Sequence, residues 1–133
     1  MEEIIAFIRS CPTYFIATID GDRQPRVRPF SSICEFEGRL YIESRYSKPF
    51  ARQVAANPWV EISAFDGVSR WIRISARLVD DPRIEAKAAM LTAMPELREI
   101  GFDEHDEDMA VYYLADAVAV FSSYTDAPRV VNC

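Results

Sequence analysis

The chain has 133 residues, half of them hydrophobic, and a formal net charge of −6 from 15 basic and 21 acidic side chains. This length suits a single domain spanning residues 1–133, and an acidic chain is a poor candidate for nucleic-acid binding, which draws on clustered lysine and arginine. No apolar run approaches the roughly 20 residues of a membrane span. Three cysteines without C-x-x-C spacing indicate reduced thiols in a cytoplasmic protein rather than a disulfide framework or a metal site.

The first part of the chain combines a short helix with short strands. Apolar residues at helical spacing predict an amphipathic helix over 2–10. Runs of β-branched and aromatic residues separated by tight turns predict strands over 13–20, 25–36 and 40–44. Pro29 lies inside the second of these strands and indicates a sheet edge or a bulge, because proline cannot donate to the ladder.

A second helix is expected after these strands. Ser47 is expected to be its N-cap, and Pro49 suits its first turn. Asn57 followed by Pro58 is expected to end the helix, because the residue before a proline disfavours helical backbone.

The second part of the chain returns to strands and then to a helix. Apolar and polar residues alternate over 59–65 and 70–80, which predicts two strands. Asp81 and Pro82 are expected to start a helix. The residues expected on the buried side of that helix are Met90, Leu91 and Met94.

The last part of the chain completes the expected architecture. A short helix is predicted over 95–101, one or two strands over 109–124, and a frayed tail after Pro128. Because short antiparallel hairpins dominate this order, we expect the α+β class. The expected fold is a small antiparallel β-barrel of about six strands with helices packed at its ends.

Two arginines share one face of a predicted strand. Side chains alternate along a strand, so Arg26 and Arg28 lie on the same side. Two like charges on one face repel each other unless an anion lies over them, and guanidinium groups match phosphate or carboxylate oxygens. The alternative is a pair of solvated arginines with acidic neighbours.

The segment 43–53 is a second candidate site for an anion. Ser44 and Ser47 offer hydroxyl groups, Lys48 offers a charge, and the start of a helix offers free N–H groups. The alternative is an ordinary capped helix with basic residues on its surface.

A third candidate feature lies on the strand over 70–80. Trp71 and Arg73 share one face, where an indole can cover a flat heterocycle and an arginine can stack on it. The alternative is a half-buried tryptophan packed on a sheet. His105 is the only histidine and lies in an acidic segment, which argues against catalytic triads and metal sites.

These segments together resemble a known family. The stretches "ATIDGDRQPRVRPF" (17–30), "LYIESRYSKPFARQVAANPWVEISAF" (40–65) and "RWIRISARLV" (70–79) are similar to the pyridoxamine 5′-phosphate oxidase-like FMN-binding split-barrel proteins. The resemblance runs over about residues 13–80. It implies a split barrel and a homodimer with one FMN at each end of the subunit interface.

The resemblance also implies a set of FMN-binding residues. In this family the strand with the R-x-R-P sequence runs beside the flavin, the next strand end and helix start hold the ribityl and phosphate groups, and the partner subunit closes the pocket. The residues implied here are Arg26, Val27, Arg28, Pro29, Phe30, Ser31, Glu43, Ser44, Tyr46, Ser47, Lys48, Gln53, Trp71 and Arg73.

The activity implied is that of a small FMN-dependent oxidoreductase that transfers hydride between a reduced nicotinamide and a small organic acceptor. A non-enzymatic flavin carrier or sensor, or a split barrel with another cofactor such as haem or deazaflavin, are the alternatives. The sequence departs from the vitamin oxidases, which end in a basic segment, since its tail "TDAPRVVNC" (125–133) has one arginine. It also lacks the histidine that nitroimidazole-reductase relatives often carry near the flavin, since residues 13–80 contain none.

Overall fold

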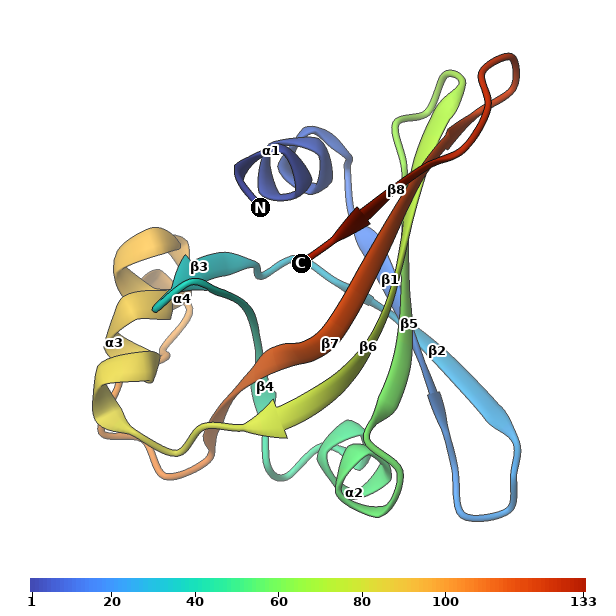
Figure 1. The fold of residues 1–133 in the computed structure, drawn as a ribbon. Coiled ribbons are helices and arrows are strands. Elements are labelled where there is room, and N and C mark those ends of the chain that lie inside the picture. The colour runs from blue at the N-terminus through green and yellow to red at the C-terminus, as the bar shows by residue number, and fades with distance from the viewer.

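In a computed structural model that describes residues 1–133, eight strands form one antiparallel sheet that curls into a split barrel (Figure 1). The α+β class is therefore confirmed, with more strands than the sequence predicts. The elements in chain order are α1 (Glu2–Ser10), β1 (Tyr14–Ile19), β2 (Pro25–Phe30), β3 (Cys34–Phe36), β4 (Arg39–Arg45), α2 (Pro49–Ala56), β5 (Trp59–Phe65), β6 (Arg70–Asp80), α3 (Ile84–Ala93), α4 (Glu96–Glu99), β7 (Met109–Ser123) and β8 (Arg129–Asn132).

The sheet is open between two strands that follow each other in the chain. The strand order is β2-β1-β5-β6-β7-β4-β3, and β8 pairs with β7 outside this path. The edge strands β2 and β3 are joined by residues 31–33. Pro29 lies on the edge strand β2, so the prediction of a sheet edge is confirmed. The opening of the barrel thus lies where β2 leaves the sheet.

Alternating side chains of β5 and β6 fill the inside of the barrel. Ile62, Ile72 and Ile74 are fully buried, whereas the residues between them are exposed or half-buried. Burying one such side chain contributes about 1.5–3 kcal/mol. The predicted alternation of both strands is confirmed.

Helices close the barrel and build a second core outside it. Ile8 of α1 and Phe50 of α2 pack into the barrel interior, one helix at each end (Figure 1). Met90 and Leu91 of α3 pack instead against the outer side of the sheet, where they contact a second buried cluster that includes Tyr41. None of the helices has the length and apolar character that crossing a bilayer requires.

Strand β7 changes the direction of its side chains at one extra residue. Before Ala115 the even-numbered residues face the barrel interior, and after Asp116 the odd-numbered residues do. The register with β6 shifts by one residue at this point, and Asp116 has a φ of 53°. This arrangement is a β-bulge, in which two residues of one strand oppose one of its partner.

Two expected boundaries are wrong because the chain leaves and rejoins the sheet. The segment 25–36 forms two strands, because residues 31–33 between them are not part of the sheet. In this short link the Ser32 carbonyl accepts a hydrogen bond from the Tyr14 hydroxyl at 2.5 Å. The tail after Pro128 is not frayed, because β8 pairs with β7. These two differences account for the two additional strands.

The starts of two helices also differ from expectation. Lys48 and not Ser47 is the N-cap of α2, because the Ser47 hydroxyl donates to Asp108. The third helix begins at Ile84, since Asp81 is engaged by the side chain and backbone N–H of Arg83.

Candidate functional site

A cavity of about 610 Å³ opens where β2 ends, between β2, β4 and the start of α2. Cavities of roughly 300–1,000 Å³ are typical of sites for small molecules and cofactors. The residues that line it are Thr13, Arg28, Pro29, Phe30, Ser31, Ser32, Glu43, Ser44, Lys48, Pro49 and Phe50.

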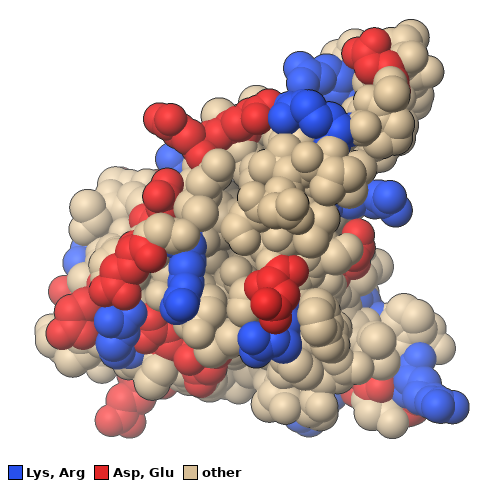
Figure 2. Space-filling model, viewed as in Figure 1, with Lys and Arg blue, Asp and Glu red and all other residues tan.

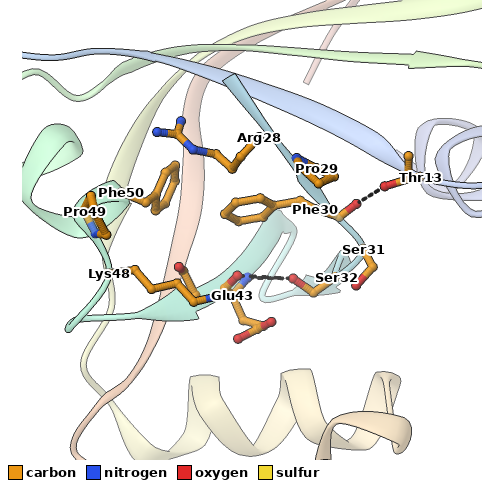
Figure 3. A pocket seen from close by; sticks show the side chains of 11 residues that line it. Thr13, Arg28, Pro29, Phe30, Ser31, Ser32, Glu43, Lys48, Pro49 and Phe50 are labelled. Atoms are coloured by element: carbon orange, nitrogen blue, oxygen red, sulfur yellow. Dashed lines mark hydrogen bonds between the residues drawn. The ribbon is translucent and has the colours of Figure 1, made fainter. Parts of the chain in front are cut away.

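Aromatic rings form one wall of the cavity. The rings of Phe30 and Phe50 lie with their centroids 5.0 Å apart (Figure 3), and Phe50 in turn contacts Tyr112 edge-on at 5.8 Å. Phe50 is buried by its place in the first turn of α2, and Phe30 ends the edge strand β2. This wall offers a flat aromatic ligand an apolar surface on which to pack.

Arg28 brings a positive charge to the cavity without a carboxylate partner. Its guanidinium donates to the Thr18 hydroxyl at 2.7 Å and to Gln53 Oε1 at 2.6 Å, and it lies 5.2 Å from the centre of the Phe50 ring. Burial lowers the pKa of Arg28, but an arginine remains charged at neutral pH. These neutral partners fix the position of the side chain and leave its charge available to an anion.

Lys48 is the second cation of the cavity that lacks a carboxylate partner. It is exposed immediately before α2, and its ammonium makes no ion pair. The neighbouring cations Arg26, Arg45 and Arg52 each lie within 3.1–3.7 Å of an aspartate oxygen. Basic and acidic side chains are likewise interspersed over the face shown in Figure 2. An anion that enters the cavity therefore meets two cations, Arg28 and Lys48, that form no ion pair.

Hydroxyl and backbone groups shape the lower rim of the cavity. Ser32 accepts a hydrogen bond from the Glu43 N–H at 3.0 Å (Figure 3), and the Thr13 hydroxyl donates to the Phe30 carbonyl at 2.9 Å. Ser44 is buried beside them. The first contact ties Ser32 to β4 and the second ties the end of β2 to Thr13, so the rim is held in place before any ligand arrives.

Glu43 carries an unusual carboxyl group at this rim. Its Oε2 is buried without a hydrogen-bond partner. Burial raises the pKa of Glu43 to about 7, although the charges of Lys48 and Arg45 act in the opposite direction. The cavity therefore contains a carboxyl group that changes its charge near neutral pH.

Seven of the residues implied by the family resemblance meet in this cavity: Arg28, Pro29, Phe30, Ser31, Glu43, Ser44 and Lys48. Gln53 does not line it but contacts it through Arg28.

The other implied residues of the first half of the chain lie elsewhere. Arg26 faces the hairpin turn, where it pairs with Asp20 and Asp22, and Val27 is exposed on the opposite face of β2. The side chain of Tyr46 donates to Asp80 at 2.6 Å, and that of Ser47 to Asp108 at 2.8 Å.

Trp71 and Arg73 lie on the outer face of β6, opposite Phe65 and Ser63 of β5. Neither residue lines the cavity, and Trp71 packs against Tyr124 with ring centroids 5.6 Å apart.

Four lining residues were not anticipated from the sequence: Thr13, Ser32, Pro49 and Phe50. Each is next to or near an implied residue, and Phe50 follows Pro49 in the first turn of α2. The helical position of Phe50 on the buried side of α2 was the signal that could have identified it.

Comparisons with known proteins agree with this fold. A NimC/NimA family protein from Clostridium acetobutylicum is 34% identical, with a TM-score of 0.94 over all of this chain and 92% of the other. A pyridoxamine 5′-phosphate oxidase-related, FMN-binding protein from Nostoc punctiforme shares the fold at 12% identity, with a TM-score of 0.65 over 99% of this chain and 95% of the other. An F420 reductase also shares the fold, at 17% identity and a TM-score of 0.63 over 82% of this chain and 90% of the other.

No match is found among curated proteins. The profile of the family described as pyridoxamine 5′-phosphate oxidase, however, matches residues 1–131. This match spans the barrel, both edge strands and every residue of the cavity, and the chain therefore belongs to the pyridoxamine 5′-phosphate oxidase family.

Proposed function

We propose that the chain is an FMN-binding oxidoreductase that transfers hydride between a reduced nicotinamide and a small organic acceptor. The observation that carries this proposal is the pair of cations Arg28 and Lys48, which face an aromatic-walled cavity without carboxylate partners. A phosphate ester with nearly two negative charges matches such a pair, and a flavin ring matches the wall. The FMN-binding relative from Nostoc punctiforme supports the choice of cofactor.

The chemistry of the residues fits the three parts of FMN. Lys48 and Arg28 would hold the phosphate, the Ser32 and Ser44 region of the rim would hold the ribityl hydroxyls, and Pro29 to Ser31 would line the ring. Bound FMN would supply hydride transfer. The protein would bind and orient the FMN and keep water from one face of the flavin ring. None of these residues is assigned a proton-transfer role in the reaction.

The proposal includes a homodimer with FMN at the subunit interface. Phe15, Trp59 and Phe65 expose 43–51% of their surface on the outer face of β1 and β5. Phe15 pairs with Pro29 of the cavity, so this apolar face reaches the cavity edge. A partner seated there would cover the apolar face and could present its Trp71 and Arg73, which share the outer face, to this cavity. Sedimentation of the wild type as a monomer at micromolar concentration would contradict the dimer.

A titration of the purified protein with FMN tests the binding site. Replacing Lys48 with methionine should weaken FMN binding by about 10–100-fold, because a charge-assisted hydrogen bond contributes roughly 1.5–3 kcal/mol. The same change should leave the affinity for riboflavin, which has no phosphate, nearly unaltered. Flavin fluorescence measures both affinities.

Arg52→Met is the matched control. Arg52 lies on α2 outside the cavity and pairs with Asp20 at 3.7 Å, so its loss should change FMN affinity less than threefold. A protein that retains no FMN would contradict the proposal. Equal losses in the Lys48 and Arg52 variants would contradict the assigned phosphate site.

The activity itself needs a separate measurement. Bleaching of bound FMN by NADH or NADPH would support an oxidoreductase, whereas a stable flavin that no nicotinamide reduces would indicate a carrier or sensor. Preferential binding of deazaflavin would favour the alternative cofactor. The F420 reductase that shares this fold is the reason to test it.

Three free cysteine thiols support the proposed cytoplasmic location.

A further inference from the structure

Glu43 holds the one buried side-chain oxygen or nitrogen in the protein that has no hydrogen-bond partner, its Oε2. Leaving such a group unpaired costs roughly 1–3 kcal/mol, so native proteins contain few of them. Glu43 is also one of the residues that line the proposed FMN cavity. A charged ligand that binds there changes the electrostatic surroundings of this carboxyl group.

Few charges act on this carboxyl group. Lys48 has the largest electrostatic influence on it, followed by Arg45, and both favour the ionised form. Arg45, however, already pairs with Asp106 at 3.3 Å and lies 3.7 Å from Asp108. Of the two cations that act on Glu43, only Lys48 has a charge that no aspartate already balances.

The groups on the other packed elements do not balance the charge of Glu43. Tyr14 of β1 and Cys34 of β3 are neutral, because burial raises the pKa of both side chains. On β7 the paired residue is the apolar Val111, and on α3 the ammonium of Lys87 donates to the backbone carbonyl of Asp106. With its pKa raised to about 7 by burial, Glu43 is about half protonated at neutral pH.

A ligand phosphate and the Glu43 carboxylate would compete for the same cation. A phosphate that pairs with Lys48 takes away the charge that most favours ionised Glu43, and it adds negative charge to the cavity. Both changes raise the affinity of Glu43 for a proton. The protonated carboxylic acid gains an O–H donor that the carboxylate lacks.

We propose that Glu43 takes up a proton when FMN binds and then, as a neutral carboxylic acid, donates a hydrogen bond to the bound ligand. This inference rests on the proposed function, because it needs the anionic cofactor in this cavity. It makes FMN binding proton-linked and gives Glu43 a binding role that depends on its protonated state.

Calorimetric titration with FMN, repeated in buffers of different ionisation enthalpy, measures the protons exchanged on binding. We expect the wild type to take up about half a proton at pH 7 and less at pH 6, where Glu43 is already mostly protonated. The phosphate ester, with a pKa near 6, releases only about a tenth of a proton at pH 7. Riboflavin should cause a smaller uptake than FMN, because it leaves Lys48 with Glu43.

Three variants separate Glu43 from other sources of protons. Glu43→Gln should abolish the uptake and should make FMN affinity nearly independent of pH between 6 and 8, whereas the wild type should lose up to about tenfold in affinity over this range. Lys48→Met should reduce the uptake, since Glu43 is then more fully protonated before binding. Glu35→Gln, an exposed residue of β3 outside the cavity, should behave as the wild type does.

The outcomes distinguish the inference from the function on which it rests. At pH 7, FMN binding without proton uptake, with net proton release, or with an unchanged uptake in the Glu43→Gln variant would overturn the inference alone. An absence of FMN binding at every pH would overturn the proposed function and the inference with it.

Discussion

Glu43 of strand β4 and Asp81, which contacts this strand, carry carboxyl groups with opposite surroundings. Asp81 accepts hydrogen bonds from the Tyr41 hydroxyl at 2.8 Å and from the Arg83 Nε at 2.9 Å. Those contacts, with the Arg83 side chain first, lower the pKa of Asp81 to about 2. Glu43 has an oxygen without any donor, and burial raises its pKa to about 7.

This difference in hydrogen-bond partners distinguishes polar groups that stabilise the fold from polar groups that are available to a ligand. The fold surrounds Asp81 with its own donors, so that carboxylate fastens β4 to the start of α3. The cations show the same contrast, because Arg45 is paired with two aspartates of the loop before β7 and Lys48 is not. The cavity thus contains a carboxyl oxygen without a hydrogen-bond donor and an ammonium group without an ion pair.

The largest expected effect is on the stability of the Glu43→Gln variant. Because folding raises the pKa of Glu43 from 4.5 to about 7, the wild type loses stability as the pH rises through this range and stays lower above it. The variant lacks this loss. It should gain about 2 kcal/mol over the wild type between pH 5 and pH 8, measured as the free energy of unfolding in urea. A constant difference across this range would show that Glu43 titrates normally.

Asp81→Asn should act in the opposite direction and in another pH range. Its lowered pKa means that ionised Asp81 stabilises the protein above pH 4, and that this contribution is lost as the pH falls toward 2. The variant should be less stable by about 1–2 kcal/mol at pH 7, after allowance for screening by water at the partly exposed Arg83. Urea unfolding at pH 7 and pH 3 measures the effect, and the difference between the two proteins should be roughly halved at the lower pH.

The smallest expected effect is on FMN affinity in the Asp108→Asn variant. Asp108 holds the Ser47 hydroxyl and backbone N–H, both at 2.8 Å, outside the cavity. Its replacement should lower the melting temperature by a few degrees and change the FMN Kd less than threefold. A large loss of FMN affinity would show that the paired side of this segment also belongs to the binding site.

The local pattern of the sequence predicts most of the fold. Strands β5 and β6 follow from alternation, and α2 ends at Ala56, just before Asn57 and Pro58 as expected. The N-cap of α2 could not be predicted, because Asp108, which engages Ser47, lies 61 residues further along the chain. The strand β8 could not be predicted either, since its only pairing partner is β7.

The candidate site could be predicted in part for similar reasons. Period-two alternation places Arg26 and Arg28 on one face, opposite Thr18 and Ile16 of β1. Alternation does not show that Arg26 lies beside the aspartates of the hairpin turn, whereas Arg28 lies under α2. The missing partner of Glu43 is equally invisible in the sequence, because it depends on the packing of separate segments.

The extra residue at Asp116 has a consequence for how two surfaces of the protein depend on each other. The first half of β7 pairs with β4, which carries the rim of the cavity, and the second half pairs with β8 and the first part of β6. Deleting Asp116 would force both halves into one phase of alternation, and one half would then turn its apolar side chains to solvent. A single residue outside the cavity thus allows one continuous strand to bury even-numbered side chains in its first half and odd-numbered side chains in its second half.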